Sequence, residues 1–235
     1  MRAFLRPFAV GFTLAAAGPG VAATSTFDLT IAGIRLGQVT LQTDENGGSY
    51  AAASRIQTAG IVGALADYYF DGRSNGRLTA DGGVVPARFV ADSRSPRADR
   101  HTEIEFKDGS PVRVSVEPPR SSAPDPASQA GTIDPVSAGF AVLRDAPPGE
   151  ICRTSVDIFD GSRRSRLRLG DPIAGEGIIT CEGTYARVEG EAHTLSSQRE
   201  FPFRLVFHAN GTGLARLHRI ETRTSFGTAV LERRP

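Results

Sequence analysis

The sequence reads "IDPVSAGFAVL" over residues 133–143, "ICRTSVDIFDGSRRSRLRL" over 151–169 and "ITCEGTY" over 179–185. The second and third segments contain the only two cysteines of the chain, Cys152 and Cys181. In a chain with an export signal, such a pair predicts a disulfide, since oxidising compartments keep paired cysteines closed. Two buried free thiols are the alternative. Closing the loop between these cysteines stabilises the fold by roughly 3.5 kcal/mol in the chain-entropy model.

The predicted disulfide restricts the shape of the sheet. Cys152 is expected to begin a strand that turns at 160–162, and Cys181 lies early in the third strand of the same meander. In a flat sheet those two strands would lie about 9.6 Å apart, whereas bridged Cα atoms approach within about 6.8 Å. Either the sheet curls here or one cysteine leaves the hydrogen-bonded ladder.

The rest of the chain alternates apolar and polar residues, as half-buried antiparallel strands do. Examples are Phe27–Leu29–Ile31, Thr102–Ile104–Phe106 and the run Phe201, Phe203, Leu205 and Phe207. Turn signals such as "ENGG", "DGG" and "KDGS" separate these runs. We therefore expect an all-β protein with a single strongly curled antiparallel sheet, an open or half barrel. One or two short helices are expected on its concave side.

Two stretches suggest those helices. One lies at 59–69, where Gly60 and Gly63 weaken the pattern, and the other follows Asp134, with Asp134 as cap and Pro135 at the first helical position. The Pro- and Ser-rich segment 118–132 reads as an exposed loop. We expect one β domain over 24–235, with a first sheet half at 24–117 and a helix plus the disulfide-stapled second half at 133–235.

Residues 1–23 have the form of an export signal: Arg2 and Arg6, an apolar centre, and small residues before a cleavage site near Ala23. The apolar centre is too short to span a membrane. Because no cysteine lies near the cleavage site, we do not expect a lipid anchor. Removal of this segment leaves 25 basic and 26 acidic residues of the 27 and 26 in the full chain. That balance does not favour nucleic-acid binding.

No familiar catalytic or cofactor motif is found, so we expect no cofactor and assign no catalytic residue. The four histidines, His101, His193, His208 and His218, have no metal-ligand spacing. Glu103 and Glu105 share a strand face and are a candidate acid–base pair, although a solvated face explains them more simply. Arg164, Arg166 and Arg168 form a candidate anion or partner contact; the alternative is an outer face neutralised by Asp157 and Asp160.

"IDPVSAGF", "VDIFDGSRRSRLRL" and "CEGTYARVEG", with the earlier "FDLTIAGIRLGQVTLQ", "DGRSNGRL" and "VVPARFVADS", resemble the DUF3108 family of exported bacterial proteins. The resemblance covers nearly all of the chain after the signal and implies a periplasmic, mainly β protein without an established activity. A looser likeness is to DUF1849 envelope-integrity proteins and to carriers of the LolA and LolB type.

Two main hypotheses for the function follow. The first is a periplasmic, non-enzymatic binding or scaffold protein, which holds a lipid or other apolar ligand against Phe203, Leu205 and Phe207 or docks an envelope protein. The second is a hydrolase acting on an envelope component through an Asp or Glu pair. A third, purely structural interpretation has the polar outer face contact peptidoglycan or another protein.

Overall fold

The computed structural model describes residues 21–58, 68–95, 98–190 and 199–235. These residues form one sheet of 15 strands, one α-helix and two short 3-10 helices. The helices are α2 (Pro135–Leu143), η1 (Pro126–Ser128) and η2 (Pro148–Glu150). The strands are β1 (Val21–Ile31), β2 (Ile34–Asn46), β3 (Ser49–Thr58), β4 (Tyr69–Leu78), β5 (Val84–Ser95), β6 (Ala98–Lys107), β7 (Ser110–Glu117), β8 (Thr132–Ile133), β9 (Ser155–Phe159), β10 (Arg163–Leu169), β11 (Ile173–Gly175), β12 (Ile178–Gly190), β13 (Glu200–Ala209), β14 (Ala215–Thr224) and β15 (Gly227–Arg233).

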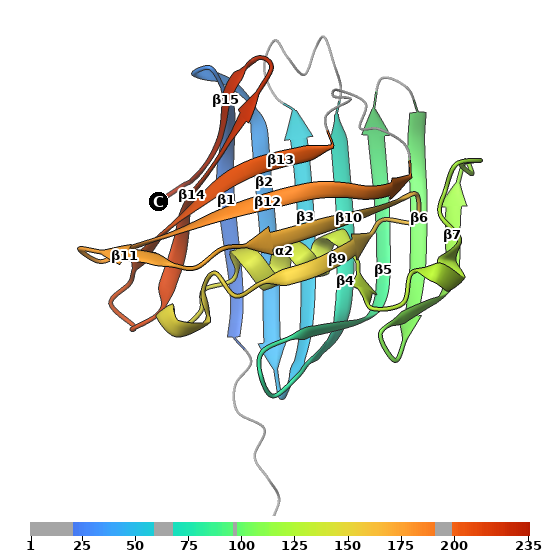
Figure 1. Ribbon diagram of the computed structural model, residues 1–235, viewed down its shortest axis with the longest axis horizontal. Coiled ribbons are helices and arrows are strands. Elements are labelled where there is room, and N and C mark those ends of the chain that lie inside the picture. Colours follow the sequence, from blue (N-terminus) through green and yellow to red (C-terminus); the bar gives the residue numbers. More distant parts are fainter. Residues whose placement is uncertain (1–20, 59–67, 96–97, 191–198) are drawn as a thin grey trace, which may run out of the picture.

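The sheet folds over on itself. Its order is β7-β6-β5-β4-β3-β2-β1-β15-β14-β13-β12-β10-β9-β8, and β11 pairs with β12 outside this path. In Figure 1, β1 to β6 run nearly upright at the back, and β9, β10, β12 and β13 cross in front of them. The last strand, β15, pairs with the first, β1, and thereby joins the two halves of the chain into one sheet.

The two edges of the sheet approach each other, so the sheet nearly closes into a barrel. The amide of Gly131, just before β8, donates to the carbonyl of Gly109 in the β6–β7 turn over 2.8 Å. The β9–β10 turn also packs on this edge, because a Cβ built on Gly161 would lie 2.8 Å from Val116. β8 and β9 pair in parallel, in contrast to the expected wholly antiparallel sheet.

The alternating pattern produces the predicted one-sided burial. Thr102, Ile104 and Phe106 on β6 are buried, whereas the intervening Glu103 and Glu105 are only partly covered. Because successive side chains of a strand point to opposite faces, the apolar set lines the inside of the barrel. Two large buried clusters result, one around Phe27, Leu205, Phe207 and Leu217, the other around Tyr50, Phe89, Ile104, Phe140 and Phe159.

The helix α2 fills the inside of the barrel. It packs against β2, β3, β4 and β5 on one side and β9 on the other (Figure 1). As predicted, Asp134 is its N-cap, accepting hydrogen bonds from the amides of Val136 and Ser137, and Pro135 is the first helical residue. Phe140 is fully buried, and its ring stacks on that of Tyr50 with 4.8 Å between the centroids.

Several expectations need revision. Cys152 does not begin a strand: it lies in a turn with φ of 66°, and β9 begins three residues later at Ser155. The segment 118–132 is not exposed throughout, because Gln129 and Thr132 are fully buried. The proposed helix at 59–69 and the export segment lie largely outside the described residues. Of the former, Tyr69 begins β4; of the latter, residues 21–23 belong to β1.

Candidate functional site

Two hollows are the candidate sites. One, which we call the mouth cavity, lies at the end of the barrel beside α2 and has a volume of about 440 Å³. The other, the outer groove, has a volume of about 770 Å³ and lies on the outer face of β2 to β5. Ligand cavities commonly occupy roughly 300 to 1,000 Å³, so both hollows are large enough for a small molecule.

Apolar side chains from distant segments line the mouth cavity. Val142 comes from the helix, Val84 from the start of β5, Val156 from β9, and Leu169 and Phe207 from the ends of β10 and β13. None of these residues is near the others in sequence, apart from the β9–β10 pair, so the cavity is a product of the folded barrel. These side chains suit an apolar group, because burial of apolar surface is the main favourable term in such binding. Polar residues, among them Thr154 and Ser155, complete the lining.

The disulfide holds one wall of this cavity. Cys152 and Cys181 are joined, with their Cα atoms 5.4 Å apart, and this confirms the predicted bridge. Cys181 is fully buried on β12 opposite Leu205 on β13, whereas Cys152 lies in the turn and lines the cavity. Of the two ways in which the bridge was expected to fit, a cysteine outside the ladder is the one observed.

Charged groups surround the opening of the mouth cavity. Arg144, at the end of α2, lies 3.4 Å from Glu45 and 3.8 Å from Glu150, and its guanidinium lies over the ring of Phe140. Arg153 is exposed and makes no ion pair within the described part of the chain. Asp81 and Glu150 line the same opening, so it carries groups of both signs, and the unpaired Arg153 is the cation that an anionic head group would contact.

The predicted apolar concavity is mostly packed. Leu205 and Phe207 are 1% and 2% exposed and belong to a core cluster, and Phe203 packs against that cluster and over Gly183. Phe207 alone among these three residues reaches the mouth cavity. Space for a ligand on the inner face is therefore found at the end of the barrel, where the helix does not fill it.

The arginine residues of β10 are largely neutralised. Arg164 and Arg166 both donate to Asp157, with Arg166 Nε 2.6 Å from Asp157 Oδ1 and Arg164 Nη2 2.5 Å from Oδ2. The hydrogen bonds from Arg166 and Arg164 outweigh the effect of burial and lower the pKa of Asp157 to about 2. Arg168 is exposed on the same strand. Because Arg164 and Arg166 are neutralised by Asp157, Arg168 is the residue of the predicted anion contact that is open to a partner.

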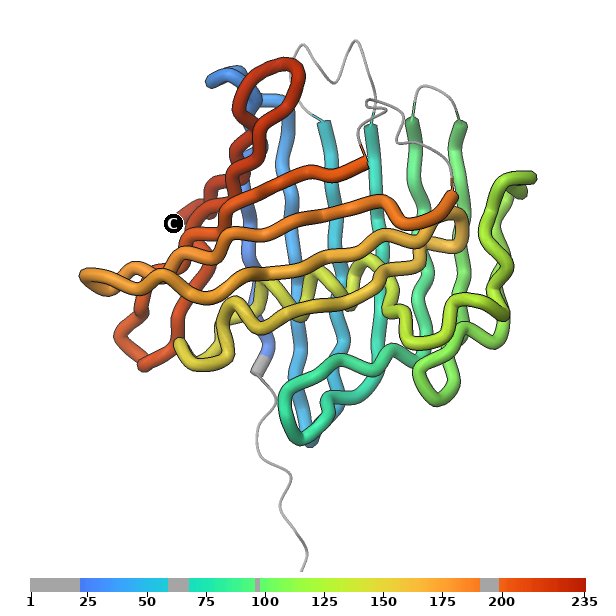
Figure 2. The backbone as a smooth tube through the Cα atoms, in the orientation of Figure 1, coloured from blue at the N-terminus to red at the C-terminus, as the bar shows by residue number. Residues whose placement is uncertain are grey.

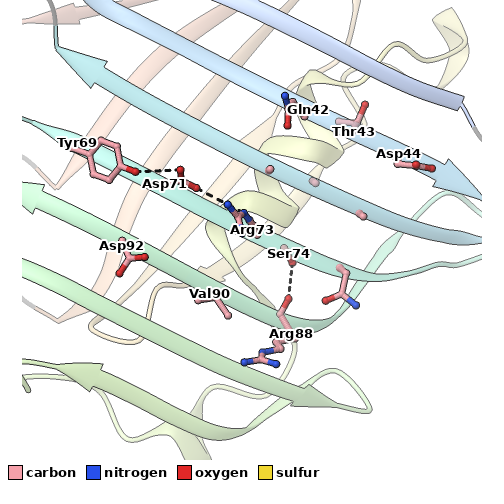
Figure 3. A pocket seen from close by; sticks show the side chains of 14 residues that line it. Gln42, Thr43, Asp44, Tyr69, Asp71, Arg73, Ser74, Arg88, Val90 and Asp92 are labelled. Atoms are coloured by element: carbon pink, nitrogen blue, oxygen red, sulfur yellow. Dashed lines mark hydrogen bonds and ion pairs between the residues drawn. The ribbon is translucent and has the colours of Figure 1, made fainter.

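The outer groove brings together two aspartates that sequence reasoning did not select. Asp71 on β4 lies directly opposite Asp92 on β5, and both line the groove (Figure 3). Opposed residues of an antiparallel pair have Cβ atoms roughly 4.5 to 5.5 Å apart. Small side chains, the exposed Ala51 and the half-buried Ala53, form part of the floor. Only the pairing register of β4 with β5 reveals the aspartate pair, because the two residues are distant in sequence.

Hydrogen bonds fix the protonation of Asp71. Burial by itself would raise the pKa of Asp71, but hydrogen bonds from Arg55 and Tyr69 outweigh it and hold that pKa below its usual range. The Tyr69 hydroxyl lies 3.2 Å from Asp71 Oδ2. Asp71 is consequently a carboxylate with satisfied acceptors and does not meet the requirement for a general acid, which needs a raised pKa.

The predicted glutamate pair lies beside this groove. Glu103 is 3.4 Å from Arg88 and 3.5 Å from His101, whereas Glu105 is 3.6 Å from Arg113. Asp92 lies 2.8 Å from the other ring nitrogen of His101, and this contact is the main reason that the pKa of His101 is raised. Glu103 and Glu105 are thus paired with different arginines, and His101 lies between Asp92 and Glu103, as expected of a solvated charged face.

Two further histidines, on β13 and β14, lie against each other. His208 on β13 stacks on His218 on β14 with 4.4 Å between centroids, and His218 lies 3.6 Å from Glu232. Within the ranges that the structure describes, no group of three or more His, Cys, Asp or Glu residues is arranged to hold a metal ion. His193 falls outside those ranges. The described residues also include no helix long and apolar enough to cross a membrane.

These features define a β-barrel-like protein whose interior is filled by its own helix and which keeps a cavity with a mixed apolar and polar lining at one end. The chain belongs to the DUF3108 family, described as a protein of unknown function, whose profile matches residues 26–232. It is also similar in fold to a crystal structure of a β-barrel-like protein of domain of unknown function DUF1849 from Brucella abortus. That similarity has a TM-score of 0.51 at 14% identity and covers 91% of this chain and 96% of the other. No curated protein matches the chain.

Proposed function

We propose that this protein is a non-enzymatic binding protein of the cell envelope, exported to the periplasm, and that it holds the apolar part of an amphiphilic ligand in the mouth cavity. The observation that carries the proposal is the cavity itself, in which apolar side chains lie beside a charged opening that includes the unpaired Arg153. The "VAA" pattern before Thr24 and the cysteine pair support export.

The experiment is native mass spectrometry of the protein purified from its own periplasm, followed by organic extraction. A bound amphiphile is the expected result. In parallel, the purified apo protein is titrated with 1-anilinonaphthalene-8-sulfonate, an anionic apolar probe. An apo mass together with no binding of this probe contradicts the proposal.

A pair of variants locates the site. Ala141→Phe places a ring at the edge of the mouth cavity, and we expect it to weaken probe binding at least tenfold by occupying the apolar space. Ala51→Phe makes the same change in the outer groove and serves as the control, with unchanged affinity expected. Equal loss in both variants, or loss only in Ala51→Phe, contradicts the assignment to the mouth cavity.

The alternative is a hydrolase acting on an envelope component, and the opposition of Asp71 and Asp92 is the observation that favours it. The lowered pKa of Asp71 excludes this residue as the acid, so the alternative depends on Asp92 as the proton donor, and Asp92 lies 2.8 Å from a ring nitrogen of His101. Two results together would establish the hydrolase. Turnover of envelope glycans would disappear in Asp71→Asn and in Asp92→Asn, and it would persist when Glu103 and Glu105 are changed to Ala.

A further inference from the structure

Two hairpin tips stand side by side at one end of the barrel. The β1–β2 turn consists of Ala32 and Gly33, both with positive φ, and the β14–β15 turn contains Ser225 and Phe226. The amide of Ala32 donates to the carbonyl of Thr228 over 3.1 Å, which fixes one tip against the other. Both lie at the upper left of Figure 2. Together they form one protrusion, which we call the twin tip.

The twin tip exposes two large apolar side chains. Phe226 is 69% exposed and is the most exposed large hydrophobic residue of the described chain, and Ile34 is 63% exposed. The Phe226 amide donates to Thr224 Oγ1 over 3.1 Å, and Thr224 Oγ1 donates to the carbonyl of Gly227 over 2.7 Å. These bonds fix the backbone of the turn from both sides, so Phe226 is presented to solvent by an ordered turn.

Positive charge exceeds negative charge beside these side chains. Arg35 follows Ile34 directly, and it shares one carboxylate, Asp28, with Arg234, each at 2.7 Å. Arg223 lies one pair inward from the β14–β15 turn, is exposed, and has no ion pair among the described residues. Glu221, further from the turn, is held by Arg219 at 2.5 Å. Arg35, Arg223 and Arg234 thus accompany two carboxylates, Asp28 and the opposed Glu232, and Glu232 also lies 3.6 Å from His218.

We propose that the twin tip docks on an anionic lipid surface, with Phe226 and Ile34 entering the interface and Arg35 and Arg223 contacting lipid phosphates. Binding to membrane surfaces adds apolar burial to attraction by anionic headgroups, and the twin tip supplies both. An aromatic ring is well suited to the interface. This site is separate from the mouth cavity, so its test is independent of the proposed function.

The chain contains no tryptophan, so a single introduced tryptophan reports on one position. Phe226→Trp is mixed with vesicles of phosphatidylglycerol and phosphatidylcholine at low salt, and we expect a blue shift of its emission. Ile173→Trp is the matched control, because Ile173 is 64% exposed on the β11–β12 hairpin, outside the twin tip. No shift in the Phe226→Trp variant, or an equal shift in the Ile173→Trp variant, overturns the proposal.

Vesicle co-sedimentation tests the two contributions separately. The double variant Phe226→Ser/Ile34→Ser is expected to lower the partition coefficient at least tenfold, since burial of one large apolar side chain is itself worth about that factor. Arg35→Gln/Arg223→Gln is expected to reduce binding to anionic vesicles and weaken its salt dependence. All four residues are exposed, and circular dichroism checks folding. The proposal is contradicted if the wild-type protein binds pure phosphatidylcholine as well as it binds anionic vesicles. It is also contradicted if the apolar double variant binds like the wild type.

Discussion

The hydroxyl of Ser74 on β4 lies 2.8 Å from Oδ2 of Asp134, the residue that caps α2. The Ser137 hydroxyl also donates to this oxygen, and Ser137 in turn lies 2.6 Å from the hydroxyl of Tyr50 on β3. The helix is therefore joined to the inner face of the sheet by a buried polar network. Burial raises the pKa of Asp134, although the hydrogen bonds to the carboxylate oppose this change.

Replacement of Asp134 by Ala is expected to lower the free energy of unfolding by about 2 to 4 kcal/mol, because it removes the cap and leaves buried donors unpaired. Urea unfolding measures the change. Asp125→Ala is the control: Asp125 caps η1 by the same kind of bond, with Oδ1 2.9 Å from the Ala127 amide, but in an exposed place. Asp125→Ala should lower the free energy of unfolding by less than about 1 kcal/mol. Equal effects would show that burial of the network adds nothing.

Cys152→Ser is expected to destabilise the protein by about 2 to 5 kcal/mol, because the open chain gains conformational freedom in the unfolded state. The bridge spans a sequence separation of 29 residues and holds a segment that contacts the rest of the sheet through the core cluster. The measurement is thermal unfolding under oxidising conditions. The wild-type protein treated with reductant should melt at the same temperature as the variant. If neither the reductant nor the substitution changes the melting temperature, the prediction is wrong.

Asp157 should contribute to the pH dependence of stability. Its pKa is about 2 in the folded protein and 3.8 in the reference state, so its contribution is fully present above about pH 4 and is lost as the pH falls towards 2. Asp157→Asn should therefore cost about 1 to 2 kcal/mol at pH 7 and much less near pH 2. The measurement is urea unfolding as a function of pH. Asp99→Asn, which affects the exposed Arg94–Asp99 pair, should have almost no effect at either pH.

The approach of the two sheet edges predicts a steric effect at Gly161. Its φ is +84°, and a Cβ there would lie 2.8 Å from Val116 and 3.1 Å from Thr102. Gly161→Ala should cost about 2 to 4 kcal/mol, combining backbone strain with overpacking. Gly109→Ala is the control with a φ of +75° and no atom within 4 Å, so it should show the strain alone, about 1 to 2 kcal/mol. Urea unfolding compares the two variants, and equal losses would mean that the edges do not touch at Gly161.

Short-range patterns were sufficient for much of the fold. The alternation at Thr102, Ile104 and Phe106 predicted which face of β6 is buried, and Asp134 with Pro135 predicted the start of α2. The family likeness carried by "IDPVSAGF" and "CEGTYARVEG" was also readable from the sequence, and the match over 26–232 confirms it. These features depend on residues within a few positions of one another, where backbone geometry fixes the relationship.

The candidate sites depended on register and closure instead. Asp71 faces Asp92 because β4 and β5 pair in one particular register, and a slip of one residue would point one of them inward. Arg164 and Arg166 share Asp157 only because β9 and β10 pair as they do. The two turns that carry Ile34 and Phe226 came together through the pairing of β1 with β15, strands from opposite ends of the chain.

The sequence by itself therefore determined local features: the alternation that marks strands such as β6 and β13, the start of α2 at Asp134 and Pro135, and which two cysteines exist to be joined. Only the tertiary structure decided that Cys152 leaves the ladder, that α2 fills the barrel, and that a cavity remains beside Phe207. The physical reason is that hydrophobic burial is non-directional. Hydrophobic burial requires that an apolar face is covered. Strand register and side-chain packing decide which element covers it.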